Sequence, residues 1–155
     1  MKGLRADRIA ALAGAYALAM ILGALGFQYF AGILPCEMCH WQRWPLIAAA
    51  IVGLLGPAAV KGDTRGLAFG TALLVGISGA IGFYQAGVEW HFFPGPEACT
   101  GTRFVFHGLD NLNEPGVVRC DVAAWRFMMI SLAGWNAIIS LGSAFTGLVM
   151  LLRKK

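Results

Sequence analysis

The chain has 155 residues, of which 58% are hydrophobic and 13% are charged, and its formal net charge is +4. An ordinary soluble domain is about 45–50% apolar, so this composition excludes that class and indicates an integral membrane protein. The basic residues divide by position along the chain, as described below. The positive charge therefore reports membrane topology and gives no reason to expect a nucleic-acid partner.

Four apolar segments are each close to the roughly 20 residues that cross a bilayer as a helix. They are residues 9–30, 44–60, 67–86 and 127–152. The second is the shortest, so we expect it either to extend back toward the preceding cysteines or to let Arg43 and Lys61 reach the interface. The sequence predicts an all-α membrane protein, a bundle of four transmembrane helices that forms one domain over residues 1–155.

Lys and Arg are retained in short cytoplasmic loops, and here most of them fall on one side of the predicted spans. That side carries Lys2, Arg5, Arg8, Lys61, Arg65, Arg153, Lys154 and Lys155. We therefore predict cytoplasmic termini, a cytoplasmic turn at 61–66, and outer loops at 31–43 and 87–126. A cleaved signal peptide is the alternative for the first segment, but its apolar run exceeds the roughly 7–15 residues of a signal core.

Small and polar residues mark the expected helix contacts. Ala11, Ala15, Ala19 and Gly23 recur at fourfold spacing in the first span, which allows close approach of helix backbones. In the last span, polar residues such as Asn136 and Ser140 would be costly against lipid, so we expect them to face other helices. Packing is the default role for these residues, and contact of Asn136 with a ligand is the alternative.

The chemistry-bearing motif is the run Pro35-Cys36-Glu37-Met38-Cys39 between the first two spans. A disulfide across two residues closes too short a loop to add much stability, so this pair favours a redox role over a structural one. Cys99 and Cys120 lie in the second outer loop, where a structural disulfide and a redox disulfide are both open. A zinc site is disfavoured, because C-x2-C followed by C-x20-C lacks a second close pair.

The start of the second helix decides how the motif is presented. If the helix begins near Pro35, which is tolerated in a first turn, then Cys36, Cys39 and Arg43 share a face. The guanidinium would then favour a thiolate on Cys39. If the helix begins at Pro45, the cysteines lie on a loop and Arg43 is an interfacial anchor.

Trp41 and Trp44 have two interpretations. They are either membrane-interface anchors, which we favour, or walls of a pocket for a flat ring.

These residues resemble the disulfide-bond formation protein B (DsbB) family of bacterial inner-membrane thiol oxidases over nearly the whole chain. The resemblance rests on the four spans, the Pro35-Cys36-x-x-Cys39 motif followed by Arg43, the lone Cys99 after Pro94-Gly95-Pro96, and Cys120-Asp121 ahead of Trp125-Arg126. The segment from Gly87 to Trp90 is similar to alphaproteobacterial members. One departure is Gln85, which stands where many relatives carry a histidine close to the quinone, and His91 lies six residues further on.

The resemblance implies a protein-thiol:quinone oxidoreductase of the bacterial inner membrane with its cysteines in the periplasm. Cys36, Cys39, Cys99 and Cys120 would be catalytic, and Cys99 would form the mixed disulfide with a DsbA-like periplasmic partner. Cys39 would pass electrons to a quinone, ubiquinone rather than menaquinone. Arg43 and Gln85 would contact this cofactor, and no metal is expected.

Two other functions compete with this interpretation. A structural tetraspan protein would use an outer loop stapled by Cys99 and Cys120 to bind a partner, but it has no need for a CxxC pair. A transporter that carries electrons inward to reduce outer thiols would usually need a redox route across the bilayer, and the predicted spans and cytoplasmic turn contain no thiol.

Overall fold

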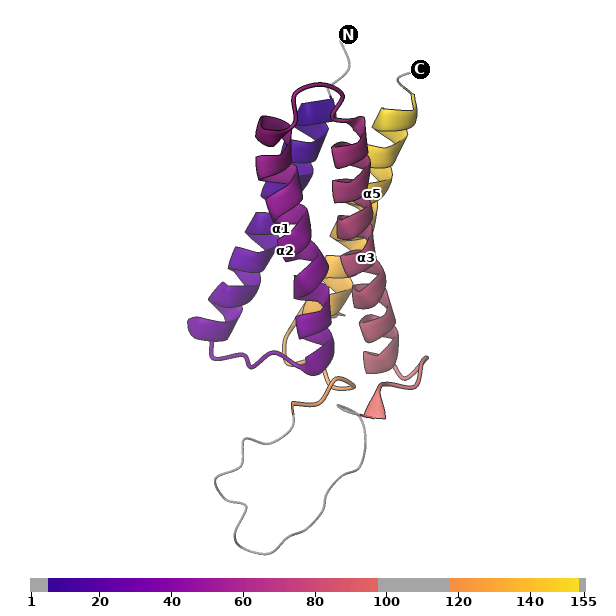
Figure 1. Cartoon of the computed structure of the whole chain (residues 1–155). Helices are drawn as coiled ribbons and strands as arrows, with labels where there is room; N and C mark the ends of the chain where they lie inside the picture. Colours follow the sequence, from indigo (N-terminus) through magenta and orange to yellow (C-terminus); the bar gives the residue numbers. More distant parts are fainter. Residues whose placement is uncertain (1–5, 98–117, 154–155) are drawn as a thin grey trace, which may run out of the picture.

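The computed structural model describes residues 6–97 and 118–153, and four long helices account for most of them. These helices are α1 (Ala6–Tyr29), α2 (Glu37–Ala59), α3 (Arg65–Glu89) and α5 (Leu132–Leu152). They run up and down as an antiparallel bundle (Figure 1). The predicted class, an all-α four-helix bundle, is confirmed.

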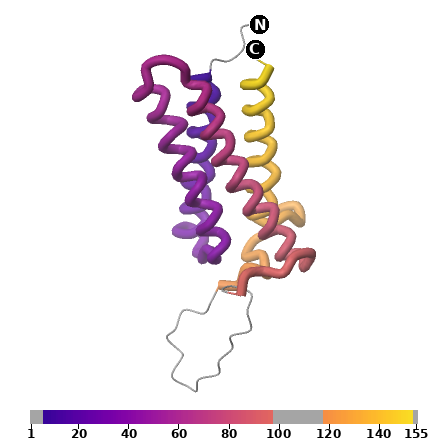
Figure 2. The backbone as a smooth tube through the Cα atoms, turned by 45° about the vertical axis from the view of Figure 1, so that its right-hand side comes forward, coloured from indigo at the N-terminus to yellow at the C-terminus, as the bar shows by residue number. Residues whose placement is uncertain are grey.

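The connections place the chemistry at one end of this bundle. The start of α1, the turn between α2 and α3 and the end of α5 lie at one end, and the start of α2 lies at the other (Figures 1 and 2). The CxxC motif and the described segment that precedes α5 therefore occupy the same end. This is the arrangement that the predicted topology requires.

Three helices of the described residues have the length and apolar character of membrane spans. They are α1, α3 and α5, with mean hydropathies of 2.0, 1.8 and 1.6 over their most apolar stretches. Helix α2 has 23 residues but is less apolar, because its first turns carry Glu37 and Arg43. Its buried positions Met38, Gln42, Leu46, Ala49, Ala50 and Gly53 recur every three or four residues, which is the pattern of a helix packed along one face.

Helix α2 begins at the cysteine motif and not at Pro45. Cys36 is its N-cap, and the sulfur of Cys36 accepts a hydrogen bond from the backbone N–H of Cys39. Pro45 lies inside the helix. The first of the two predicted registers is therefore the observed one, and Cys39 and Arg43 follow one another along one face.

A short hairpin precedes the last helix. Strands β1 (Arg126–Phe127) and β2 (Ile130–Ser131) pair antiparallel, and the two methionines between them have positive φ angles of 50° and 66°. The side chain of Ser131 then caps α5 by accepting a hydrogen bond from the N–H of Gly134. The helix consequently starts at Leu132, although the apolar sequence begins at Phe127.

Helices α1 and α2 make their closest contact through two glycines. A Cβ atom built on Gly14 would lie 2.9 Å from the backbone of Gly53, and one built on Gly53 would lie 2.5 Å from the carbonyl oxygen of Ala10. Side chains at either position would force the two backbones apart. Small residues therefore set the separation of these helices. The contact runs through Gly14 and not through the predicted stripe, of which Ala15, Ala19 and Gly23 are exposed.

We predict that Gly53→Ala lowers the thermal stability of the detergent-purified protein, by about 1–3 kcal/mol. The added methyl group would meet backbone atoms of α1, which cannot rotate away as a side chain can. Thermal unfolding followed by circular dichroism measures the effect. Gly70→Ala in α3 is the matched control, because a Cβ there meets nothing within 4 Å and alanine favours a helix; equal losses in both variants would contradict the assignment of this contact.

Candidate dithiol and cavity site

The two cysteines of the CxxC motif are free thiols in direct contact. Their sulfur atoms lie 2.7 Å apart, compared with about 2.05 Å for a disulfide bond. Cys36 is buried at the N-cap of α2, and Cys39 is partly exposed one turn later. A small movement of the first turn would therefore close or open a bond between them.

The surroundings of the pair favour a negative charge on Cys39. The hydrogen bond from Cys36 is the largest cause that lowers the pKa of the Cys39 thiol below its usual range, and Gln85 and the positive charge of Arg43 act in the same direction against the effect of burial. The same hydrogen bond is the largest cause that raises the pKa of Cys36. A single proton shared by the pair is therefore favoured on Cys36, with the thiolate on Cys39.

Gln85 of α3 reaches across to both sulfur atoms. Its side-chain nitrogen lies 3.4 Å from the sulfur of Cys36 and 3.6 Å from that of Cys39. The same nitrogen donates a hydrogen bond of 3.3 Å to Glu89, whose second carboxylate oxygen has no partner within the described residues. The predicted cofactor residue Gln85 therefore contacts the thiols themselves.

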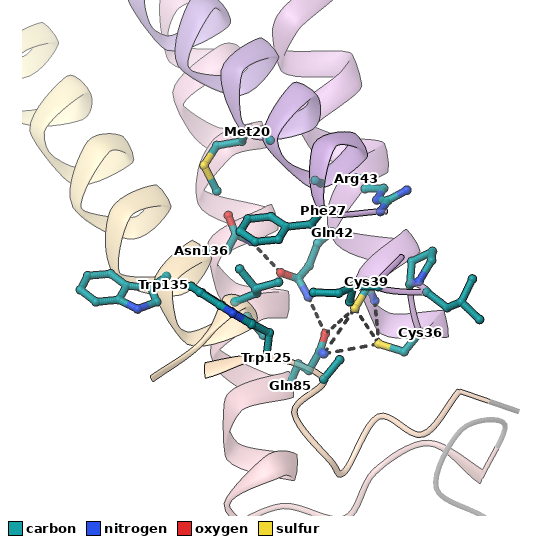
Figure 3. A pocket seen from close by; sticks show the side chains of 18 of the residues that line it. Met20, Phe27, Cys36, Cys39, Gln42, Arg43, Gln85, Trp125, Trp135 and Asn136 are labelled. Carbon is teal, nitrogen blue, oxygen red and sulfur yellow. Dashed lines mark hydrogen bonds between the residues drawn. The ribbon is translucent and has the colours of Figure 1, made fainter. Parts of the chain in front are cut away.

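A cavity of about 330 Å³ borders the dithiol and lies among all four helices and the segment before α5. Phe27, Trp125 and Trp135 supply aromatic rings to its wall, and Arg43 supplies a cation (Figure 3). The guanidinium of Arg43 donates a hydrogen bond of 2.8 Å to Gln28 of α1. Most of the remaining lining residues are apolar, so the cavity is mainly hydrophobic, with polar groups at the end near the thiols.

The third described cysteine packs next to this pair. Cys120 is 1% exposed, is disulfide-bonded, and belongs to a buried cluster with Cys36 and Met38. Cys99 lies outside the described residues. The fold therefore brings a sulfur atom of the segment before α5 against the CxxC motif at the start of α2.

Several residues of the site were not identified from the sequence. Gln42 and Glu89 border the cavity without having been singled out, and Asn136 reaches it although packing was its expected role. Trp41 and Trp44 are 42% and 71% exposed and are not among the lining residues, as expected for interfacial anchors. Within the described chain His91 does not border the cavity either. Gln42 lay in the segment predicted as an outer loop, so the sequence carried no signal for its burial.

Comparisons with known proteins agree with the geometry. The family model "Disulfide bond formation protein DsbB" matches residues 6–150. Similar proteins named Disulfide bond formation protein B include one from Polaromonas sp. (strain JS666), 28% identical over 94% of this chain and 90% of its own length. Another, from Paracidovorax citrulli, is 31% identical over 94% of this chain and 87% of its own length. No solved structure gives a significant match. With a family match over nearly its entire length, this multi-pass membrane chain belongs to the DsbB family of disulfide bond formation proteins.

Proposed function

We propose that this protein oxidises the dithiol of a DsbA-like periplasmic partner and passes the electrons to a membrane quinone, with ubiquinone favoured. The observation that carries the proposal is the contact of Cys36 and Cys39 with a mainly apolar cavity that also holds Arg43. Cys120, packed against the same pair, supplies the second disulfide that a relay needs.

The cavity fits a quinone by size and by chemistry. Its volume of about 330 Å³ is in the range of small-molecule sites, about 300–1,000 Å³. Aromatic and aliphatic walls suit a flat ring with an apolar tail. When bound, a quinone would accept two electrons and two protons, and Arg43 and Gln85 would hold its oxygens near the thiols, where a cation stabilises developing negative charge.

The relay consists of successive thiol–disulfide exchanges. A thiolate of the partner forms a bond to Cys99 and breaks the Cys99–Cys120 bond, and the second thiol of the partner then releases Cys99 as the partner becomes oxidised. The two loop thiols next reduce the Cys36–Cys39 disulfide and reform their own.

Energetics favour a high-potential acceptor. A DsbA-type dithiol has a reduction potential of about −120 mV, and a relay from DsbA through DsbB to quinone keeps the bacterial periplasm oxidising. A weaker oxidant such as a glutaredoxin disulfide, at about −200 mV, could not reoxidise it.

A structural tetraspan protein with a disulfide-stapled loop is the second candidate. The disulfide at Cys120 is compatible with that role. A structural protein does not need two free sulfurs beside a cavity, so we rank this candidate second.

Replacing Cys39 by Ala is expected to abolish quinone reduction by a dithiol donor, lowering kcat by roughly a hundredfold or more, because the nucleophilic sulfur is lost. Absorbance of the quinone during turnover of the purified protein in detergent measures this. His40→Ala, at the exposed neighbouring residue, is the control and should turn over normally. Normal turnover of both variants would refute the relay.

Arg43→Ala is expected to raise the apparent KM for quinone about tenfold, which corresponds to ~1.4 kcal/mol, and to leave the KM for the protein dithiol nearly unchanged. Loss of the cation removes a contact to the acceptor and none to the outer loop. Arg43→Lys keeps the charge but loses the planar guanidinium group, so the apparent KM for quinone should be intermediate. Unchanged quinone kinetics would leave Arg43 as an anchor that holds Gln28.

The sidedness of the thiols is a separate prediction. An impermeant maleimide added to spheroplasts after mild reduction should label Cys36 or Cys39 and Cys99 or Cys120, because both pairs face the periplasm. Peptide mass spectrometry identifies the labelled residues, and a cysteine introduced at Gly62, in the turn at the opposite end, should remain unlabelled until the membrane is permeabilised. Labelling of either native pair only after permeabilisation would contradict the topology.

A further inference from the structure

A chain of side-chain amides leads from the middle of the bundle to the thiols. Asn136 of α5 donates a hydrogen bond of 2.7 Å to the side-chain oxygen of Gln42 on α2, and Gln42 donates one of 2.6 Å to the side-chain oxygen of Gln85 on α3. All three residues are at least 93% buried, with exposed fractions of 5%, 7% and 4%. Figure 3 shows this line of side chains ending beside Cys36 and Cys39.

The direction of this chain is set by backbone carbonyl groups. An amide side chain can in principle be turned over, which exchanges its donor nitrogen and its acceptor oxygen. The nitrogen of Gln42 also lies 3.3 Å from the carbonyl oxygen of Met38, and the nitrogen of Asn136 lies 3.3 Å from that of Ser78. Carbonyl oxygens only accept hydrogen bonds, so each amide must present its nitrogen there.

The fixed orientation of Gln42 determines that of Gln85. The side-chain nitrogen of Gln42 lies 2.6 Å from the side chain of Gln85, so the atom of Gln85 at this contact must be its oxygen. Two donors facing one another would leave buried polar groups unsatisfied. The nitrogen of Gln85 is then turned to the two sulfur atoms and to a carboxylate oxygen of Glu89, all of which can accept. The thiols accordingly face a donor on α3 whose orientation is decided by Gln42, which lies on the same helix as the thiols.

We propose that Gln42, supported by Asn136, is a positioning residue that holds the amide N–H groups of Gln85 toward the dithiol, so that Gln85 stabilises the thiolate of Cys39. The inference rests on the proposed function in taking Cys39 as the reactive sulfur. A donor to the charged form of a group favours that form. In contrast to a histidine, an amide keeps its donor at every pH near neutrality.

The test measures the reactivity of Cys39 with iodoacetamide as a function of pH, in reduced protein purified in detergent without quinone or partner. Peptide mass spectrometry reports Cys39 alone, and a Cys36→Ala background prevents the shared proton from blurring the midpoint. Gln85→Met should move the midpoint upward by roughly one to two pH units, the size expected for one lost hydrogen bond to a charged group. Gln42→Met should move it upward as well.

The double variant Gln42→Met/Gln85→Met decides whether Gln42 acts through Gln85. If it does, the double variant shifts the midpoint no further than Gln85→Met alone, because the positioning residue has nothing left to position. Additive shifts, or no shift in Gln42→Met, would overturn the proposal. A thermal melt of each variant identifies any that fails to fold, and Gln85→Met compared with the parent then still tests the donor itself.

Ser140→Ala is the matched control within the same network. Ser140 donates a hydrogen bond of 2.8 Å to the side-chain oxygen of Asn136, but the carbonyl of Ser78 still fixes the direction of Asn136 in its absence. The midpoint of Cys39 should therefore stay in place, whereas an equal shift in Ser140→Ala and Gln42→Met would indicate general loosening of the bundle and overturn the proposal. If the purified protein does not reduce quinone but the pH midpoints of Cys39 shift as expected, the proposed relay is contradicted and the proposed role of Gln42 is retained.

Discussion

The hydrogen bond between Gln42 and Gln85 is the contact on which the geometry of the site depends. It joins α2, which carries the two thiols, to α3, in a bundle whose core consists largely of small and apolar side chains. Apolar surfaces slide past one another at little cost, whereas a buried donor and acceptor lose a partner if the helices shift. The polar chain therefore fixes the register of α2 against α3 and α5 at the level of the sulfurs, and Ser78, which donates to the carbonyl of Gln42, adds a second tie at the same level.

Packing at the two ends of α1 explains why a cavity exists at all. In its first half, Gly14 lies against Gly53 so closely that no side chain fits. In its second half, Gly23 and Gly26 have nothing within 4 Å of a Cβ position, and residues of this half line the cavity. Small residues in α1 thus give close contact at one end and face open space at the thiol end. Arg43 spans this space through its hydrogen bond to Gln28.

The sequence was sufficient for the helical architecture and for locating the CxxC pair, and it was insufficient for the groups that surround that pair. Apolar length and the CxxC motif before a span are local properties, so the four helices could be predicted. The sequence left the start of α2 open between the cysteine motif and Pro45, and the structure places Pro45 inside the helix. Gln42 could not be predicted as part of the site, because a glutamine beside an interfacial arginine is typical of a helix end facing the headgroups, and its burial depends on where α3 and α5 lie. The Met128–Met129 turn could not either, because residues with positive φ in a two-residue hairpin loop are usually Asn or Gly.

Gln85 stands where many relatives carry a histidine, and its neighbours determine what this difference changes. A histidine at this position would donate and accept through separate nitrogens and would change charge near neutral pH, so its effect on the adjacent thiols would vary with pH. Glutamine cannot exchange a proton, and its donor and acceptor are held apart by the amide of Gln42 on one side and the sulfurs on the other. The residue that could take up a proton at this end of the cavity is instead Glu89, whose side chain is 6% exposed and is held by the same nitrogen of Gln85. In this chain the fixed donor and the titratable group are thus carried by two residues, one helical turn apart on α3, and Gln85 touches both the sulfurs and the carboxylate.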